Sequence, residues 1–207
     1  NWEMVISDDG NDSLDLSQLL LTYAEQDQRI KVVSSPCNQG ISHATNLAIR
    51  SSSGEFIAFM DQDDRLHPQA LEAIATQMQK QPADLYYTDE DRLDSRGERV
   101  EPFLKPEWSP ALLKCMMYAG HLCVYRRSML DRSGLCDSSF DGTQDWELAL
   151  RVTDQPGCRV VHVPGVFYHW RIGGHSADAV NNERCHERGE LAVTASVRRA
   201  EVDGDVE

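Results

Sequence analysis

Asp61, Asp63 and Asp64 follow a short apolar segment, residues 57–60, in the stretch GEFIAFMDQDDRLHP. The apolar segment predicts a strand that is buried on both faces of a sheet. Ligands bind near the C-terminal ends of strands in open α/β sheets, and carboxylate oxygens suit Mg²⁺ or Mn²⁺ better than zinc. The residues leave a second interpretation open, in which Asp63 or Asp64 caps the helix that Pro68 begins.

The chain around these acids alternates between strand and helix patterns. We expect strands over residues 4–6, 30–33 and 57–60, each followed by an amphipathic helix. The apolar positions of the three helices are Leu16, Leu19, Leu20 and Tyr23, then Ile41, Ala44, Leu47 and Ala48, then Leu71, Ile74, Ala75 and Met78. This alternation predicts an α/β fold with a mostly parallel sheet flanked by crossover helices.

A different pattern begins after residue 82. A strand over 84–88 ends in a second acidic cluster, Asp89, Glu90 and Asp91, which either lines an acceptor site, competes for a cation or forms a solvated turn. Further along we expect a strand at 121–125, helices at 126–132 and 143–152, strands at 159–163 and 166–170 around Pro164-Gly165, a helix at 179–200 and a disordered acidic tail. We find no linker between two cores, so we expect one domain over residues 1–200.

Bulk properties exclude several classes of protein. The net charge of −14 argues against a nucleic-acid partner, because neutralising phosphates needs a basic surface. No apolar run approaches the roughly 18 residues of a membrane span, and the first residues show no signal-peptide pattern. The six cysteines form no CxxC pair, which favours reduced thiols in a cytoplasmic protein over a zinc site.

Four motifs occur in an order that resembles a known family. They are Asp8-Asp9-Gly10, Asn38-x-Gly40 with Ala44 and Asn46, GEFIAFMDQDD, and Gln144-Asp145-Trp146-Glu147-Leu148 ahead of Arg151. Together they resemble the family 2 glycosyltransferases with the GT-A fold, a Rossmann-like α/β fold, in the branch that builds bacterial surface polysaccharides. The resemblance implies a nucleotide-binding part at 1–83, an acceptor-binding part at 84–175, a C-terminal helix at 176–200 and a tail at 201–207. It also implies that the family's usual first strand and helix precede residue 1.

The resemblance assigns roles to individual residues. Asp9 matches the carboxylate that accepts a hydrogen bond from the N3–H of a uracil-type base, and Asp145 matches the general base. The nucleotide-sugar site would comprise Asp8, Asp9, Asn38, Gly40, Asn46, Asp61 and Arg171, and the metal site Asp61, Asp63 and His169. The plainer alternatives are a turn closed by Asp8 and Asp9, and a helix-terminal acid without chemistry at Asp145. Burial beside Trp146 raises the pKa of Asp145 and the helix N-terminus lowers it, so the sign stays open.

The implied activity is a metal-dependent inverting transfer of a hexose. The donor would be a nucleotide-diphosphate sugar, UDP-linked, the cofactor Mn²⁺ or Mg²⁺, and the acceptor a hydroxyl of a glycan or lipid-linked glycan. The location would be cytoplasmic, at the inner face of the plasma membrane through other parts of a longer protein. Two alternatives remain: a non-catalytic GT-A module of a polysaccharide-assembly protein, and a nucleotidyltransferase or phosphohydrolase, which the absence of a glycine-rich phosphate loop with its lysine disfavours.

Overall fold

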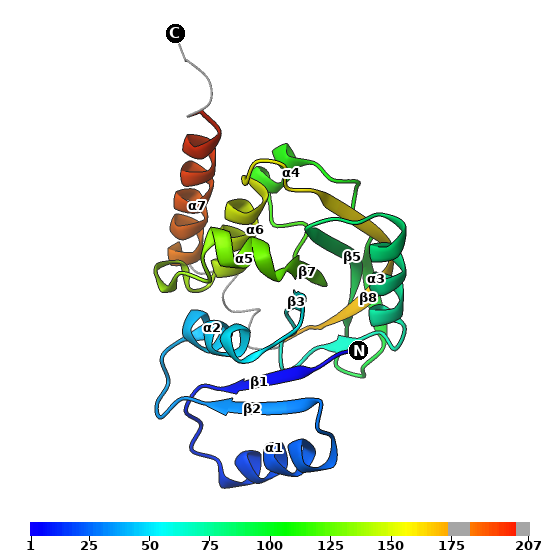
Figure 1. Ribbon diagram of the computed structural model, residues 1–207, viewed down its shortest axis with the longest axis vertical. Helices are drawn as coiled ribbons and strands as arrows, with labels where there is room; N and C mark the ends of the chain where they lie inside the picture. The colour runs from blue at the N-terminus through cyan, green and yellow to red at the C-terminus, as the bar shows by residue number, and fades with distance from the viewer. Residues whose placement is uncertain (174–182, 202–207) are drawn as a thin grey trace.

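The N-terminal part of the computed structural model is a two-stranded parallel sheet with two helices (Figure 1); the structure describes residues 1–173 and 183–201. Its elements are β1 (Met4–Asp8), α1 (Leu14–Gln26), β2 (Ile30–Ser34) and α2 (Ile41–Ser51). The strands pair in parallel, with Met4 opposite Ile30 and Asp8 opposite Ser34. The strand and helix expectations for this part are therefore confirmed.

A second sheet contains six strands. They are β3 (Phe56–Ala58), β4 (Arg65–Leu66), β5 (Leu85–Leu93), β6 (Arg99–Phe103), β7 (Cys123–Arg126) and β8 (Val160–Arg171). The strands are ordered β3-β7-β5-β8-β4, with β6 also paired to β5. Strands β5 and β8 are parallel, whereas the other pairs in this sheet are antiparallel. The α/β class is confirmed, but parallel pairing does not dominate here: the turn from β5 to β6, for example, is too short for a crossover helix.

The remaining helices pack on this second sheet or on one another. They are α3 (Ala70–Lys80), α4 (Pro110–Cys115), α5 (Arg127–Ser133), the 3-10 helix η1 (Ser138–Phe140), α6 (Gln144–Thr153) and α7 (Glu183–Glu201). One buried cluster joins β5 and β7 to α5 and α6, and a second joins β5 and β8 to α3. Among residues 1–173 and 183–201, no helix is long and apolar enough to cross a bilayer. The start of the expected last helix, 179–182, and most of the acidic tail lie outside the described residues.

Strand β3 differs from the expected strand. It has three residues instead of four, and Ala58 and Met60 are exposed although Ile57 is buried. One of its edges pairs with β7, and the other has no strand partner within the described chain. Strand β1 likewise has β2 as its single strand partner among the described residues, and β1 and β3 belong to separate sheets (Figure 1). The expectation of burial on both faces was wrong because a cavity opens beside this edge.

Helix α1 forms as its apolar spacing predicts, but its apolar side chains are poorly covered by the rest of the protein. None of its residues is buried, and Leu16, Leu19 and Tyr23 are 40, 51 and 52% exposed. Ser13 caps the N-terminus of the helix, because its hydroxyl accepts a hydrogen bond from the N–H of Leu16. The apolar face is thus largely open to solvent.

Two of the alternatives that the sequence left open for the acidic clusters do not occur. Asp89, Glu90 and Asp91 lie inside the extended strand β5 rather than in a turn after it. Asp63 and Asp64 do not cap a helix, because β4 intervenes and Gln69 occupies the N-cap of α3. The two late strands are in fact one strand, β8, in which Pro164-Gly165 forms a bulge: Thr88 pairs with Val163 and Asp89 with Val166.

Candidate active site

A cavity of about 2490 Å³ opens between β1, the loop after β3, and the N-terminus of α6. Six of the predicted site residues line it: Asp8, Asp9, Asn38, Asp61, Asp63 and Asp145. Four others do not: Gly40, Asn46, His169 and Arg171. Three acids from distant parts of the sequence, Asp9, Asp63 and Asp145, therefore share the walls of one cavity.

The acids after β1 hold the N-terminal wall in place. The Asp8 carboxylate accepts a hydrogen bond from the N–H of Asn11 at 3.0 Å and so closes the turn there. The Asp9 carboxylate accepts from the N–H groups of Gln39 and Gly40, at 3.0 and 2.8 Å. Each oxygen retains a second lone pair that can accept from a ligand. The turn interpretation holds for Asp8, while Asp9 ties β1 to the start of α2 at the cavity.

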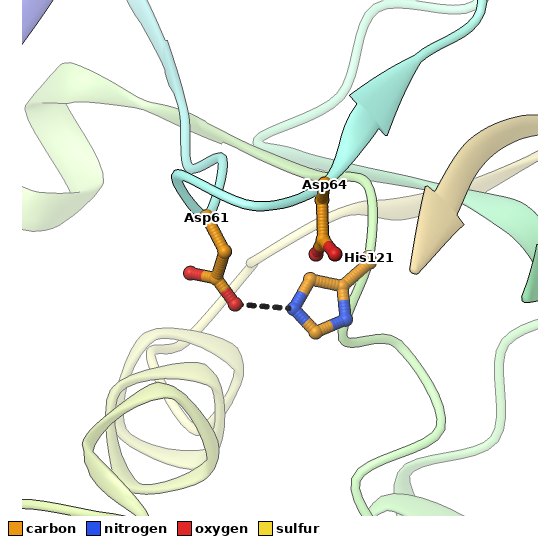
Figure 2. Close-up of side chains that lie close together, drawn as sticks. All are labelled: Asp61, Asp64 and His121. Carbon is orange, nitrogen blue, oxygen red and sulfur yellow. Dashed lines mark ion pairs between the residues drawn. The ribbon is translucent and has the colours of Figure 1, made fainter. Parts of the chain in front are cut away.

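A histidine that the sequence analysis did not identify joins the acids after β3. Figure 2 shows the carboxylates of Asp61 and Asp64 next to the imidazole of His121, with Asp61 Oδ2 3.6 Å from His121 Nε2. One ligand atom from each of the three residues lies within 4.8 Å of the others, so the group could hold a cation. His121 was missed because it precedes β7 by two residues, and no spacing rule connects it to the acids.

The acids of this loop differ in how far they are free to bind a ligand. Asp64 is buried, accepts from the Tyr168 hydroxyl at 2.7 Å and from the N–H of Arg171 at 2.8 Å, and has a raised pKa because burial disfavours its charge. Asp63, in contrast, faces the cavity, and its carboxylate has no hydrogen-bond partner among the described residues. Asp64 therefore anchors the loop to β8, and Asp61 and Asp63 present oxygens to the cavity.

His169 and Arg171 lie behind the loop rather than in the cavity. His169 is 6% exposed, and its Nδ1 lies 2.5 Å from Asp91 Oδ1. The Arg171 guanidinium donates to the carbonyl of Asp63 at 2.7 Å, and so supports the loop from outside. The structure thus places His121, not His169, beside the candidate metal ligands.

Asn46 makes structural contacts. Its amide donates to the carbonyl of Cys136 at 2.8 Å and accepts from the N–H of Cys136 at 2.9 Å, which fastens α2 to the segment before α6. Gly40 lies at the N-terminus of the same helix with a φ of +95°, and a Cβ there would lie 2.7 Å from Asp141 Oδ2. Both residues shape the wall without lining it.

Asp145 lies at the start of α6 and faces the cavity. Its side chain is exposed to the cavity, and the protein that surrounds the cavity raises its pKa by desolvation. Hydrogen bonds from the N–H groups of Trp146 and Asp145 itself, and the nearby His121, act in the opposite direction without cancelling the rise. The sign that the sequence left open is therefore upward, as a general base requires.

Glu147, the second acid of the Asp145-Trp146-Glu147 motif, does not line the cavity. Its carboxylate accepts from the Arg151 guanidinium at 2.7 and 2.6 Å, and Arg151 also donates to the carbonyls of residues 133–135. Trp146 donates from Nε1 to the carbonyl of Leu113 at 2.7 Å. These neighbours fix the orientation of α6, and with it the position of Asp145.

The second acidic cluster is divided by the alternation of side chains along β5. Asp89 accepts from the N–H groups of Lys105 and Gly165 and pairs with His162, each at 2.8 Å; burial works against its charge, but these contacts lower its pKa. Asp91 pairs with Arg99 and His169. Both are structural, and Glu90, between them, lines the cavity.

Trp108 packs in the core against Tyr87 and Tyr118. Trp170 lines the cavity, with the Arg92 guanidinium 4.8 Å from its ring centroid.

Comparisons with known proteins agree with this arrangement. Residues 1–134 match the model of glycosyl transferase family 2. An uncharacterized protein of Sinorhizobium fredii is 34% identical over 96% of this chain, and the O-antigen biosynthesis protein RfbC of Myxococcus xanthus is 36% identical over 84%. The chain spans only 22% and 14% of the length of these two relatives.

A solved structure supports the fold. The crystal structure of S. aureus TarS residues 1–349 in complex with UDP-GlcNAc superposes with a TM-score of 0.75 at 18% identity, over 99% of this chain and 59% of that TarS chain. At this identity the likeness shows a shared fold, the GT-A fold of the glycosyltransferases. With the family match covering residues 1–134, more than half of its length, this chain belongs to glycosyl transferase family 2.

Proposed function

We propose that this chain forms a domain of a metal-dependent, inverting glycosyltransferase. The domain binds the nucleotide sugar and carries the general base. It transfers a sugar from a nucleotide-diphosphate donor, UDP-linked, to a hydroxyl of a cell-surface glycan. The observation that carries the proposal is that Asp9, Asp63 and Asp145 line one cavity. The O-antigen role in the name of RfbC supports a polysaccharide acceptor, and the UDP-GlcNAc bound to TarS supports a UDP-linked donor.

The donor occupies the side of the cavity formed by β1 and the loop after β3. Asp9, fixed by the N–H groups of Gln39 and Gly40, accepts a hydrogen bond from the base. The diphosphate lies toward Asp61 and Asp63, where a divalent cation would be held. Oxygen donors from these two aspartates fit Mg²⁺ or Mn²⁺, and the unpartnered Asp63 carboxylate fits a direct ligand. When bound, the cation would neutralise charge on the departing diphosphate.

Asp145 acts on the acceptor. Its carboxylate takes the proton of the acceptor hydroxyl while that oxygen forms a bond to the anomeric carbon of the donor sugar. The bond from the anomeric carbon to the phosphate oxygen breaks, and the electron pair leaves with the diphosphate. One displacement from the face opposite the leaving group inverts the anomeric centre.

Metal-dependent nucleotide binding tests the donor site. We expect calorimetry to show that wild-type protein binds UDP more tightly with Mn²⁺ than without it, and that Asp63→Ala loses this difference. Asp131→Asn, an exposed aspartate of α5, is the matched control and should behave like wild type. Equal UDP binding by wild type and Asp63→Ala at every Mn²⁺ concentration would reject the assignment.

One observation favours the alternative of a non-catalytic module. The free edges of β1 and β3 and the exposed α1 leave the β1–β2 unit with few contacts to the second sheet among the described residues. A transfer assay on the longer protein that contains this chain separates the two. Transfer that disappears in Asp145→Asn supports the enzyme, and nucleotide binding without transfer supports the module.

A further inference from the structure

Glu90 is one of the acids of the cavity wall that the donor, cation and base assignments leave without a role. It lies on β5, and its side chain faces the cavity while its neighbours Asp89 and Asp91 point into the protein. One oxygen, Oε2, accepts from Lys105 Nζ at 2.9 Å and from the N–H of His121 at 3.2 Å. The other oxygen, Oε1, has no hydrogen-bond partner among the described residues.

Lys105 holds this carboxylate rigidly. Its side chain is fully buried, at 0% exposure, and its ammonium group also donates to the carbonyl of His121. A buried ammonium is costly unless it is paired, so Lys105 fixes Glu90 against the segment that carries His121. The free oxygen is thereby held as a preformed acceptor on the cavity wall.

The position of Glu90 relates it to the reacting groups. His121 lies between Glu90 and Asp61: its Nδ1 is 3.8 Å from Glu90 Oε2 and its Nε2 is 3.6 Å from Asp61 Oδ2. The His121 ring also stacks on Tyr168, with centroids 4.7 Å apart, so its orientation is fixed. Asp145 is also near enough to His121 for its charge to raise the pKa of that imidazole, so Glu90, Asp61 and Asp145 line one cavity around His121.

In an in-line displacement the transferred sugar must occupy the space between the diphosphate and the base. A carboxylate is acceptor-only and accepts strong hydrogen bonds from hydroxyl groups. We propose that Glu90, positioned by Lys105, accepts hydrogen bonds from hydroxyls of the transferred sugar and so contributes to the choice of donor sugar. This proposal rests on the function proposed above, because it needs the diphosphate at Asp61 and Asp63.

The test compares a nucleotide with its sugar conjugates. Dissociation constants for UDP, UDP-glucose, UDP-galactose and UDP-GlcNAc are measured with Mn²⁺ for wild type, Glu90→Gln and the exposed-glutamate control Glu98→Gln. Glu90→Gln should bind UDP as wild type does, while its affinity for the preferred UDP-sugar falls about tenfold, the loss expected for a hydrogen bond to a charged group. Glu98→Gln should match wild type for all four ligands.

Three outcomes overturn the proposal. An equal loss for UDP and for the UDP-sugar would show a structural role only, and unchanged affinity for both would show that Glu90 does not contact the sugar. If wild type binds none of these ligands, the proposed function fails and this proposal fails with it, which separates that case from the other two. Glu90→Asp retains the charge beside Lys105 but withdraws the acceptor by one methylene, so it should show the same selective loss if Glu90→Gln does not fold.

Discussion

His121 Nε2 lies 3.6 Å from Asp61 Oδ2, and this contact joins the loop after β3 to the segment before β7 at the floor of the cavity. The contact places an imidazole beside the aspartates proposed to hold a cation. Burial lowers the pKa of His121, but Asp61 and Glu90 raise it by a larger amount, so the pKa of His121 is raised overall. His121 therefore lies beside the candidate metal ligands. Asp64, the third member of the group, already accepts hydrogen bonds from Tyr168 and Arg171.

Replacement of His121 should weaken the coupling between cation and nucleotide. We expect His121→Gln to lower the Mn²⁺-dependent part of UDP affinity by about tenfold, the loss typical of a supporting residue of a metal site. Calorimetry at several Mn²⁺ concentrations measures it, with His43→Gln in α2 as the control. An unchanged Mn²⁺ dependence would show that the contact with Asp61 is incidental.

The pH dependence of transfer should report Asp145. Because burial raises its pKa, protonation removes the base at a higher pH than for an ordinary aspartate, whose pKa is about 3.9. We expect kcat/KM to fall as the pH drops through this raised pKa, and Asp145→Asn to lower kcat by about 10²–10⁴-fold at neutral pH. A pH profile that is flat across the acidic range, or an Asp145→Asn variant with normal kcat, would contradict the assignment.

The same shift predicts the opposite effect on stability. A carboxyl whose pKa is raised by folding binds more protons in the folded than in the unfolded state, so stability decreases as pH rises through the window between the two pKa values. Removal of the charge in Asp145→Asn should therefore raise the free energy of unfolding at pH 7. Urea denaturation at pH 7 measures this change; a decrease would show that the carboxylate is stabilised by its surroundings.

Asn46 should matter for stability more than for binding. Asn46→Ala removes two hydrogen bonds to the backbone of Cys136, which should cost about 1–3 kcal/mol of unfolding free energy. Urea denaturation and UDP titration on the same variant separate the two roles. Unchanged stability with loss of UDP binding would restore the nucleotide role implied by the family resemblance.

Gly10 should be needed for the shape of the nucleotide wall. Its φ is +76°, and a Cβ would lie 2.4 Å from the carbonyl carbon of Cys37, so Gly10→Ala must displace the turn that Asp9 holds. Gly157, with the same φ of +76° and nothing within 4 Å of its Cβ position, is the matched control. Gly157→Ala should cost only about 1–2 kcal/mol of backbone strain, whereas Gly10→Ala should be less stable and also weaken UDP binding. Equal effects of the two substitutions would indicate strain alone.

The sequence predicted the local elements well and their long-range partners poorly. Apolar spacing located α1, α2 and α3 because a 3.6-residue period is a property of the segment itself. It could not show that α1 has no buried residue, or that β3 pairs antiparallel to β7, since both depend on what packs alongside. The sequence also did not show that the acids at 89–91 lie within a strand. The residues that pair with them there, Lys105, His162 and His169, are in distant segments.

The same limit applies to the site. Asp9, Asp63 and Asp145 were identified from motifs, and the cavity brings them together. The family resemblance assigned His169 to the metal site, but His169 is turned toward Asp91, and His121 lies next to Asp61. Residue type and spacing cannot separate these cases, since the choice depends on which face of the sheet each imidazole occupies.

A crystal structure with Mn²⁺ and UDP tests the central claim most directly. The account predicts an anomalous manganese peak coordinated by Asp63, the uracil hydrogen-bonded to Asp9, and the Asp145 carboxylate facing the space beyond the β-phosphate. Manganese bound away from Asp63, or a nucleotide bound outside the cavity that contains Asp9 and Asp145, would contradict it.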